Sequence, residues 1–417
     1  MNGRIRHRLR MIPPLLACGG LLLACDRPSP PESPPPSATA APREAAAPDA
    51  LATSGQATPE GSAANETADV GNDILLTNLR QAGLRLEGLR GTAADPIVVR
   101  PRNPNDQILV MNPVGDWSIE IIDCRHVRIE SMQVFNANQG GILIRGTPEA
   151  PCHDVEVSQS DVLPRSTSDD YDIGVCIEYG SEIKISDLNV LHAVDAAIDV
   201  RRTKDLSIRD VIIRGVGSEK YGVRLGIGVH GAILNAIACV SLSGNAFGVG
   251  VVSPDPSQGA PTASQAHATT DVTITRCSTD EGNAPIVLGS ASNVLIEYCT
   301  FMLPRQFVIG PAPVDGRWPP ASGIRLNRNL VEWFPSDLEA ILAPSIAGGV
   351  EPLGENLWWS SELPEMLPIL GGFPEASAPQ RIDLDPKMFR PRLEPLNSEA
   401  IRFGLRAPEA EIDPRAE

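Results

Sequence analysis

The feature that most constrains the fold is an internal repeat of short strands within residues 73–333. Each repeat opens with a short strand of alternating apolar and polar residues, whose inward-facing anchors are Val127, Val155, Ile183, Leu206, Ile233, Val272 and Val294. A second strand follows, often entered through a glycine, and its anchors are Ile142, Val175, Ile198, Val223, Val249 and Ile286. The shortest spacing between first-strand anchors is 22 residues, and longer repeats carry inserted loops.

This combination of repeat length and strand content predicts a coiled chain. Two or three short strands within roughly 22 residues leave no room for a helix between them. Successive coils then pair through parallel ladders about 4.8 Å apart, with one face of every strand inside. We therefore predict an all-β fold, a right-handed single-stranded parallel β-helix. A leucine-rich repeat is disfavoured because its helical segment and Leu/Asn pattern are missing, and a propeller blade is about twice as long as this unit.

Two segments outside the repeats carry a family resemblance. The segment LRGTAADPIVVRP, residues 89–101, is similar to the opening of β-helix polysaccharide lyases of the chondroitinase B and alginate lyase type. The segment FRPRLEPLNSEAIRFG, residues 389–404, resembles the closing segment of secreted β-helix proteins, with Glu399 where a proline is usual. Together with the repeats, they resemble the pectate-lyase-like superfamily. The resemblance implies the fold but not the reaction, because this superfamily includes lyases, hydrolases, epimerases and proteins without known chemistry.

The N-terminus has the features of an export signal. The basic segment RIRHRLR precedes MIPPLLACGGLLLAC, an apolar stretch shorter than the roughly 20 residues that span a bilayer as a helix. It resembles a bacterial lipoprotein signal, in which Leu22 to Cys25 match the lipobox; LLAC at Cys18 also fits but would leave an apolar stub. We predict a signal peptide over residues 1–24 and lipidation of Cys25. The protein would then be anchored in the cell envelope, on the extracytoplasmic side of a bacterial membrane, in the periplasm or on the cell surface.

The segments that flank the repeats differ from them in composition. Residues 25–72 are rich in Pro, Ala and Ser and predict a disordered linker. Residues 334–417 predict a capping segment and tail, with a brief helix in PSDLEAIL capped by Ser336 and Glu339. The net charge limits the partners that we expect. Removal of the signal peptide deletes four arginines and no acid, which takes the formal charge from −17 to −21. This negative charge argues against nucleic acid as a partner. We expect a monomer whose partners are a polysaccharide or other extended polymer and, through the lipid, the membrane.

Stacking of the repeats predicts which charged residues share a face. One residue after the second-strand anchors, an outward column contains Leu143, Cys176, Asp199, Arg224, Gly250 and Val287. Asp199 and Arg224 then lie on adjacent coils, with Asp195 and Lys220 at the neighbouring corner. The candidate catalytic residues are therefore Lys220, Arg224, Asp199 and Asp195. The candidate substrate-binding residues are Asp172, Arg201 and Glu178, together with Trp358 and Trp359. The two tryptophans either stack on a sugar ring or cover the open end of the coil stack as a terminal cap.

Three functions fit this cluster. A uronate lyase needs a cation or metal to neutralise the sugar carboxylate, and a Lys or Arg base to remove the C5 proton. A glycoside hydrolase needs two carboxyl groups about 5 to 10 Å apart, which Asp172 or Asp195 could provide with Asp199. The alternative to cleavage is a carbohydrate-binding or structural cell-envelope protein, in which the same charges form solvated salt bridges worth about 0 to 1 kcal/mol each. The primary prediction is binding of a polysaccharide, with lyase-like β-elimination as its catalytic form.

Other residues suggest a metal ion and a disulfide. Asp169, Asp170 and Asp172 in STSDDYD could bind Ca²⁺, although a solvated turn explains them as well. Cys124 and Cys152 lie three residues before their strand anchors, and neighbouring coils bring such positions within disulfide range. Because the exported side of a bacterial membrane is oxidising, we predict a disulfide between them. An interior ladder of reduced thiols is the alternative.

Overall fold

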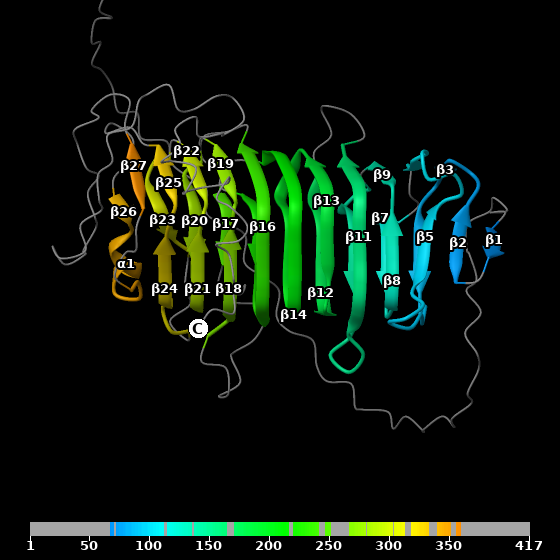
Figure 1. Ribbon diagram of the computed structural model, residues 1–417, viewed down its shortest axis with the longest axis horizontal. Coiled ribbons are helices and arrows are strands. Elements are labelled where there is room, and N and C mark those ends of the chain that lie inside the picture. Colours follow the sequence, from blue (N-terminus) through cyan, green and yellow to red (C-terminus); the bar gives the residue numbers. More distant parts are fainter. Residues whose placement is uncertain are drawn as a thin grey trace, which may run out of the picture. The chain divides into compact units, whose positions relative to one another are not determined.

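The computed structural model confirms the predicted all-β class: of the residues that it describes, 68% are in strands and 2% in helix, and they form a parallel β-solenoid of about eight turns. The structure describes residues 67–70, 72–111, 115–135, 137–164, 171–216, 220–241, 247–251, 267–280, 282–302, 304–312, 318–332, 340–351 and 356–359. Among these residues, no helix is long and apolar enough to span a membrane. Figure 1 shows the strands of successive coils side by side along the solenoid.

Three parallel ladders run along the solenoid, and we call them A, B and C. Ladder A contains β2 (Asp73–Leu76), β5 (Ile97–Pro101), β8 (Arg125–Glu130), β18 (Thr269–Thr275), β21 (Ala291–Glu297) and β24 (Ser322–Asn327). Ladder B contains β3 (Arg80–Gln81), β6 (Ile108–Val110), β9 (Met132–Phe135), β19 (Ser278–Asp280), β22 (Thr300–Met302), β25 (Leu330–Glu332) and β27 (Leu357–Trp359). Ladder C contains β4 (Leu84–Glu87), β7 (Trp117–Ile122), β10 (Gly140–Arg145), β12 (Tyr171–Ser181), β15 (Tyr221–Leu225), β17 (Phe247–Val251), β20 (Ala284–Leu288), β23 (Phe307–Pro311) and β26 (Ala340–Leu342).

The remaining long strands pass from one ladder to the next. They are β11 (Cys152–Leu163), β13 (Lys184–Leu191) and β16 (Val229–Ser241), which each contribute to ladders A and B. The longest, β14 (Ala193–Val216), contributes in turn to ladders C, A and B. Strand-helix-strand units are therefore absent from the described coils, as the repeat length predicts.

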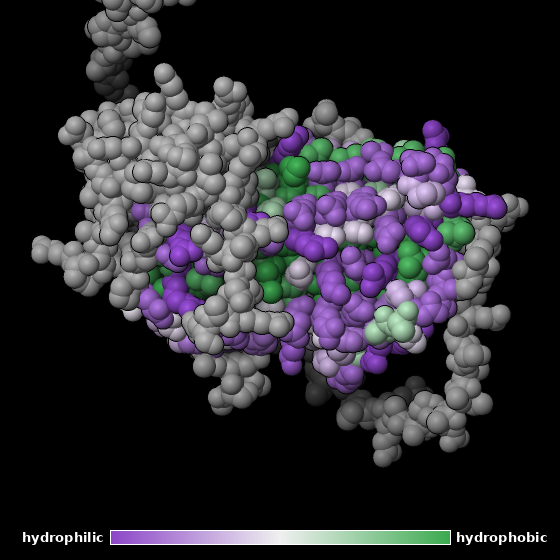
Figure 2. Space-filling view, in the orientation of Figure 1, coloured by the Kyte–Doolittle hydropathy of each residue, from purple (hydrophilic) through white to green (hydrophobic). Residues whose placement is uncertain are grey.

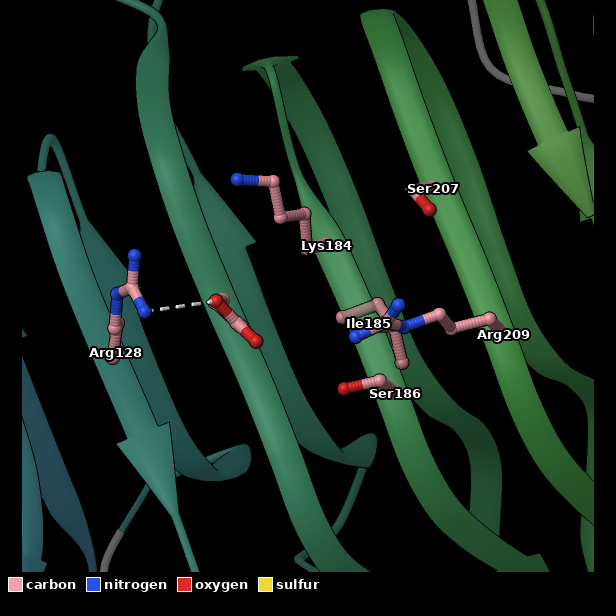
Figure 3. A pocket seen from close by; sticks show the side chains of 7 residues that line it. Arg128, Lys184, Ile185, Ser186, Ser207 and Arg209 are labelled. Carbon is pink, nitrogen blue, oxygen red and sulfur yellow. Dashed lines mark ion pairs between the residues drawn. The ribbon is translucent and has the colours of Figure 1, made fainter. Parts of the chain in front are cut away.

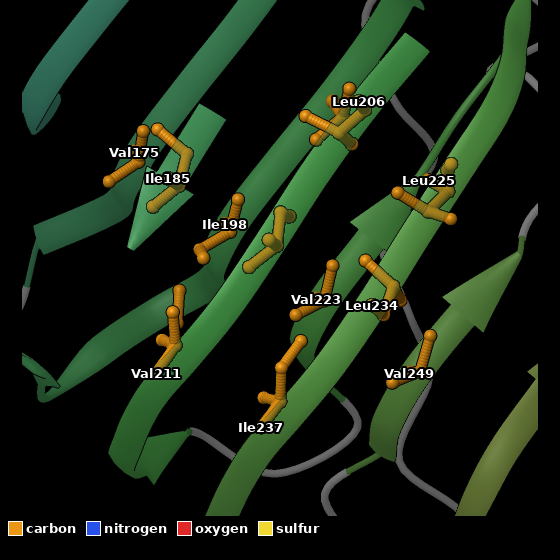
Figure 4. Close-up of a cluster of buried hydrophobic side chains, with 14 of the residues drawn as sticks. Val175, Ile185, Ile198, Leu206, Val211, Val223, Leu225, Leu234, Ile237 and Val249 are labelled. Carbon is orange, nitrogen blue, oxygen red and sulfur yellow. The ribbon is translucent and has the colours of Figure 1, made fainter. Parts of the chain in front are cut away.

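The second-strand anchors form one continuous column in ladder C. The predicted order is confirmed by the register, in which Ile142, Val175, Ile198, Val223, Val249 and Ile286 are successive partners. All six side chains are at most 1% exposed, so this column is part of the core. Figure 4 shows members of this column together with buried side chains of the other ladders, among them Ile185, Leu206, Leu234, Val211 and Ile237.

Small residues precede this column because the coils approach closely there. A Cβ on Gly174 would lie 2.5 Å from the carbonyl oxygen of Ala197 in the next coil and 2.5 Å from Cγ1 of Val190 in ladder B. Real Cβ atoms do not approach this closely, so the position takes a glycine or another small residue. This contact explains why a glycine so often precedes the aliphatic anchor in the sequence.

One first-strand anchor was predicted wrongly. Six of the seven occupy the inward column of ladder A, but Ala232, not Ile233, pairs with Leu206 and with Val272. Ile233 points outward and is 48% exposed, whereas Ala232 is fully buried. The two residues are adjacent in the sequence, and the larger apolar side chain was the better anchor by hydropathy alone. The register of the neighbouring coils decides the position instead.

From β8 onward, two columns of residues in the left-handed backbone conformation bend the chain on either side of ladder A. The first column precedes the ladder A anchor with φ between 48° and 69°, and contains His126, Asp154, Glu182, Asp205, Gly231, Asp271, Asn293 and Gly323. The second follows five residues later with φ between 50° and 60°, and contains Ser131, Gln159, Asp187, Asp210, Ala236, Arg276, Tyr298 and Arg328. Asp, Asn and Gly adopt this conformation at the lowest cost, which accounts for their frequency in the first column. These single-residue bends position the strands without long loops.

The ends of the solenoid differ from the predicted boundaries. At the N-terminal end, β1 (Thr67–Val70) pairs antiparallel with β2 and covers part of its edge, inside the segment predicted as linker. At the C-terminal end the ladders continue beyond residue 333, because β26 pairs with β23 and β27 pairs with β25. The helix predicted in PSDLEAIL is wrong at residues 340–342, where Leu342 is fully buried in a strand; packing against the preceding coil outweighs helix propensity. Ser336 and Glu339 lie outside the described residues, and the short helix α1 (Pro344–Ala347) begins later.

Candidate functional site

The outer face of ladder C carries a cluster of charged residues on neighbouring coils. As predicted, Asp199 pairs in register with Cys176 on one side and with Arg224 on the other. The Nε of Arg224 donates a hydrogen bond of 2.7 Å to Oδ1 of Asp199. The register that brings the two residues together comes from their inward neighbours Ile198 and Val223, which anchor the same two strands.

Three further charged residues complete this cluster, which we call the ladder C cluster. Nη2 of Arg224 lies 2.8 Å from Oδ2 of Asp195, and Nζ of Lys220 lies 3.4 Å from Oδ1 of the same carboxylate. Nη2 of Arg201 lies 2.6 Å from Oδ2 of Asp199, an ion pair without hydrogen-bond geometry. Two carboxylates therefore share three cations across two adjacent coils.

Exposure differs sharply among these charged side chains. The side chain of Asp199 is 1% exposed and that of Arg224 is 17% exposed, whereas that of Lys220 is 41% exposed. Burial disfavours the charged form of Arg224, but its hydrogen bond to Asp199 and the charges of Asp199 and Asp195 outweigh burial and raise its pKa. The guanidinium thus remains protonated and can stabilise negative charge, but it cannot act as the base that the sequence suggested.

An aromatic pair that the sequence analysis did not select lies beside the cluster. The rings of Tyr221 and Phe247, on adjacent coils, stack with centroids 5.2 Å apart. The guanidinium carbon of Arg224 lies 5.9 Å from the centroid of the Tyr221 ring, within the range of a cation–π contact. Burial raises the pKa of the Tyr221 hydroxyl, and the positive charge of Arg224 opposes this shift.

Apolar side chains flank the charged pair along the outer face of ladder C. On one side, Trp117, Leu143 and Cys176 form a buried cluster. Burial raises the pKa of the Cys176 thiol to about 12, and the negative charge of Asp199 adds to this effect. On the other side, Ala284 and Val287 pack with the aromatic pair. The charged groups are thus bounded along the ladder by low-polarity surface, which strengthens electrostatic interactions with a ligand.

Glu178 lies two residues further along the same ladder. The register aligns it with Arg201, which was predicted to share its face, and with Arg145, which the sequence analysis did not select; its carboxylate lies 3.4 Å from Nε of Arg145. Its other oxygen accepts a hydrogen bond of 3.2 Å from Nη1 of Arg202. Glu178 therefore belongs to a neighbouring ion-pair network and has two arginine partners of its own.

Several of the predicted site residues or their side chains lie outside the part of the chain that the structure describes. Asp169 and Asp170 lie outside the described residues, as does the side chain of Asp172 on β12. Trp358 and Trp359 belong to β27, the final strand of ladder B, but their side chains also lie outside the described part of the chain. Across the residues that are described, no group of three His, Cys, Asp or Glu side chains is arranged to hold a metal ion. The predicted lipidation site Cys25 is not described either.

The predicted disulfide positions are adjacent, but both thiols are free in the structure. The pairing of Arg125 with His153 places Cys124 and Cys152 on neighbouring coils, and the backbone N–H of Cys124 lies 3.4 Å from Sγ of Cys152. Both side chains are fully buried, and burial raises the pKa of the Cys124 thiol to about 11. The structure therefore has the reduced form that the sequence left as the alternative.

The fold defines the class of protein, a parallel β-helix with a charged cluster on the outer face of one ladder. No family model matches the sequence, and no curated protein matches it. Among solved structures, an alginate lyase from Paenibacillus is 15% identical, with a TM-score of 0.43, over 71% of this chain and 93% of that one. A lacto-N-biosidase from Eubacterium ramulus is 10% identical, with a TM-score of 0.44, over 69% and 62% of the two chains. The Streptococcus pneumoniae surface protein and adhesin PfbA is 10% identical, with a TM-score of 0.43, over 61% and 80%.

Proposed function

We propose that this protein binds a polysaccharide along the outer face of ladder C. The observation that carries the proposal is the gathering of the ladder C cluster and the Tyr221–Phe247 stack on adjacent coils. Asp195, Arg201 and Lys220, whose side chains are 32%, 30% and 41% exposed, provide an acceptor and donors for sugar hydroxyl groups, and charge-assisted hydrogen bonds are the stronger kind. An aromatic face provides apolar contact area for the C–H face of a sugar ring. Because the ladder repeats along the solenoid, an extended chain suits this surface better than a small molecule does.

Cleavage by β-elimination is the catalytic form of this proposal, and Lys220 is its base. Lys220 is the most exposed cation of the cluster, and a lysine amine is a general base of the kind that β-elimination needs. In the elimination, Lys220 takes the C5 proton, the C4–O bond to the leaving sugar breaks as the C4=C5 double bond forms, and water gives a proton to the leaving oxygen. Arg224 stays protonated because its pKa is raised, so its role is to stabilise the negative charge that builds up on the sugar carboxylate as C5 loses its proton. Without turnover, the same surface serves a carbohydrate-binding or structural envelope protein.

Export and lipid anchoring form a separate part of the proposal. The basic segment, the short apolar stretch and the lipobox ending at Cys25 support it. In this arrangement the Pro-, Ala- and Ser-rich segment tethers the solenoid to a bacterial membrane. Metabolic labelling with radioactive palmitate tests the anchor. Label should enter the wild-type chain and not the Cys25→Ala chain, and equal labelling of both would contradict the assignment.

A panel of uronic-acid and neutral polysaccharides tests binding and cleavage together. We expect Lys220→Ala to weaken binding about two- to fivefold, because the change removes one partly exposed charged partner. Lys204→Ala is the matched control, since Lys204 lies on the same solenoid in the exposed part of β14. If the protein is a lyase, the wild-type chain also produces unsaturated sugar that absorbs ultraviolet light, and Lys220→Ala abolishes it. If Lys220→Ala binds the polysaccharide as tightly as Lys204→Ala does, the ladder C cluster is not part of the binding site.

A further inference from the structure

A second candidate site lies on ladder A, apart from the ladder C cluster. It is a hollow of about 410 Å³ on the outer face of the sheet. Figure 3 shows its lining, which consists of Arg128, Glu156, Lys184, Ile185, Ser186, Ser207 and Arg209. The described surface in Figure 2 is mostly hydrophilic, as the outward positions of the ladders require. We call this hollow the ladder A groove.

The parallel register arranges the groove residues in two columns across four coils. Arg128, Glu156, Lys184 and Ser207 are successive partners in the first column, and Ser186 pairs with Arg209 in the second. With coils about 4.8 Å apart, the three cations span roughly 14 Å along the solenoid. This length matches two or three residues of an extended sugar chain better than it matches one small anion.

The cations of the groove are only partly neutralised by protein groups. Nη1 of Arg128 lies 3.6 Å from Oε2 of Glu156, and Nζ of Lys184 lies 3.3 Å from Oδ1 of Asp154. Arg209 is exposed and makes no ion pair within the ranges that the structure describes. The register pairs Arg209 with Ser186, and in Figure 3 its guanidinium extends over the neighbouring strand β13, where Ile185 is labelled. An arginine in this position offers a planar pair of donors to a carboxylate.

The acidic residues near the groove limit the class of anionic ligand that the groove can bind. Glu156 forms part of the floor, and Asp154, Glu182 and Asp205 occupy the adjacent bend. A polyphosphate or a nucleic acid would meet these carboxylates with like charge and offer them few hydrogen-bond donors. A sugar acid offers a carboxylate to the cations and hydroxyl donors to the carboxylates and serines. The mixed lining therefore fits an acidic sugar better than it fits a bare polyanion.

We propose that the ladder A groove is a second glycan-binding site, which holds a carboxylate-bearing sugar chain independently of the ladder C cluster. Arg209 and Arg128 contact sugar carboxylates, and Ser186, Ser207 and Glu156 contact hydroxyl groups. The inference shares with the proposed function only the class of ligand. Two sites on different faces of one rigid solenoid would raise the affinity for a long polymer through effective concentration, without any new contact.

Calorimetric titration of the full chain with oligogalacturonate tests this site. We expect Arg209→Ala to weaken binding at the groove about two- to fivefold, and the triple variant Arg128→Ala/Lys184→Ala/Arg209→Ala to weaken it about tenfold or more. Arg214→Ala is the matched control, because Arg214 is exposed on the same strand beyond the bend at Asp210 and lies in ladder B. It should leave the dissociation constant unchanged. A neutral oligogalactose of the same length should not bind at the groove.

The outcomes separate this inference from the proposed function. Loss of oligogalacturonate binding in the triple variant but not in Lys220→Ala supports the groove, even if the ladder C cluster binds nothing. Unchanged binding in the triple variant, or a wild-type chain that does not bind oligogalacturonate, overturns it. An oligonucleotide that binds the groove as tightly as oligogalacturonate overturns the assigned ligand class. Loss of all binding in Lys220→Ala overturns the independence of the two sites.

Discussion

Asp199 and Arg224 are 25 residues apart in the chain, yet a hydrogen bond of 2.7 Å joins Oδ1 of the aspartate to Nε of the arginine. The contact exists because β14 and β15 pair in parallel with these two residues opposite each other. The carboxylate is buried, so its charge is compensated by arginines and not by water. Residues that are one turn of the solenoid apart in the sequence thus form an ion pair on the outer face of ladder C.

This ion pair makes a prediction about stability. Asp199→Ala leaves Arg224 buried with one carboxylate partner fewer, and breaking a buried pair in this way costs about 3–5 kcal/mol. The pair of Arg85 and Glu120 lies in the same outward column, with Nη1 2.6 Å from Oε2, but Arg85 is 60% exposed. Glu120→Ala should therefore cost about 1 kcal/mol or less. Urea denaturation measures both values, and similar losses in the two variants would contradict the burial of the Asp199 pair.

A second prediction contrasts two isoleucines that hydropathy alone does not distinguish. Ile198 is fully buried in the ladder C column, whereas Ile233 is 48% exposed on ladder A. Ile198→Ala should lower the free energy of unfolding by about 2–5 kcal/mol through lost burial and a residual cavity. Ile233→Ala should change it by about 0.5 kcal/mol or less. Comparable losses in chemical denaturation would show that the ladder A register is wrong.

The sequence predicted the coiled fold and the ladder C register because its signals recur in every coil. Alternating strands and glycines that precede an aliphatic anchor repeat along the chain, and each repetition supports the others. The register failed at Ala232, where a small buried residue stands beside a larger exposed one. The extension of the ladders to β26 and β27 was also missed. For β26 the reason is that PSDLEAIL has a helical pattern, whereas packing against the previous coil makes its last three residues a strand.

The sequence predicted the charged residues of the ladder C cluster but neither the aromatic pair beside it nor the ladder A groove. Charged residues of the ladder C cluster could be aligned once the anchors were known, and their contacts follow that alignment. The stack of Tyr221 on Phe247 was not selected because it lies two residues before the anchor, where the glycine step changes which way side chains point. The ladder A groove was missed because its cations are single residues on separate coils, without a local motif.

The cysteines give a prediction that needs no substitution. All six cysteines between Cys124 and Cys299 are buried and free, and burial raises the pKa of the Cys124 thiol to about 11. The native protein should therefore react with almost no thiol reagent at pH 8, because both access and thiolate content are low. In denaturant, six thiols should react in the processed chain, from which Cys18 is removed and in which Cys25 carries the lipid. A count of four in that chain after denaturation would reveal a disulfide, with Cys124 and Cys152 as the first pair to examine.

The bend at Asp154 predicts a contribution to acid stability. Burial raises the pKa of this carboxyl, but hydrogen bonds from His126 and Lys184 and their positive charges outweigh burial and hold it below its ordinary value. A carboxylate whose pKa is lower in the folded state stabilises the fold above its unfolded value of about 3.9, and this stabilisation is lost as the pH falls below that value. Asp154→Asn should thus be less stable than wild type at pH 7, and the difference should shrink below about pH 3.9. A difference that does not change with pH would contradict this role.

The most direct test of the proposed function is a titration of wild-type and Tyr221→Ala chains with the polysaccharide that binds best in the panel. Tyr221 stacks on Phe247 beside the ladder C cluster, and loss of an aromatic contact of this kind costs about 0.5–1.5 kcal/mol. We predict a dissociation constant about two- to tenfold higher for Tyr221→Ala. Tyr179→Ala, which removes a ring that lies beside Arg202, should bind as wild type does. Unchanged affinity in Tyr221→Ala, with the chain still folded, would contradict the assignment of ladder C as the binding face.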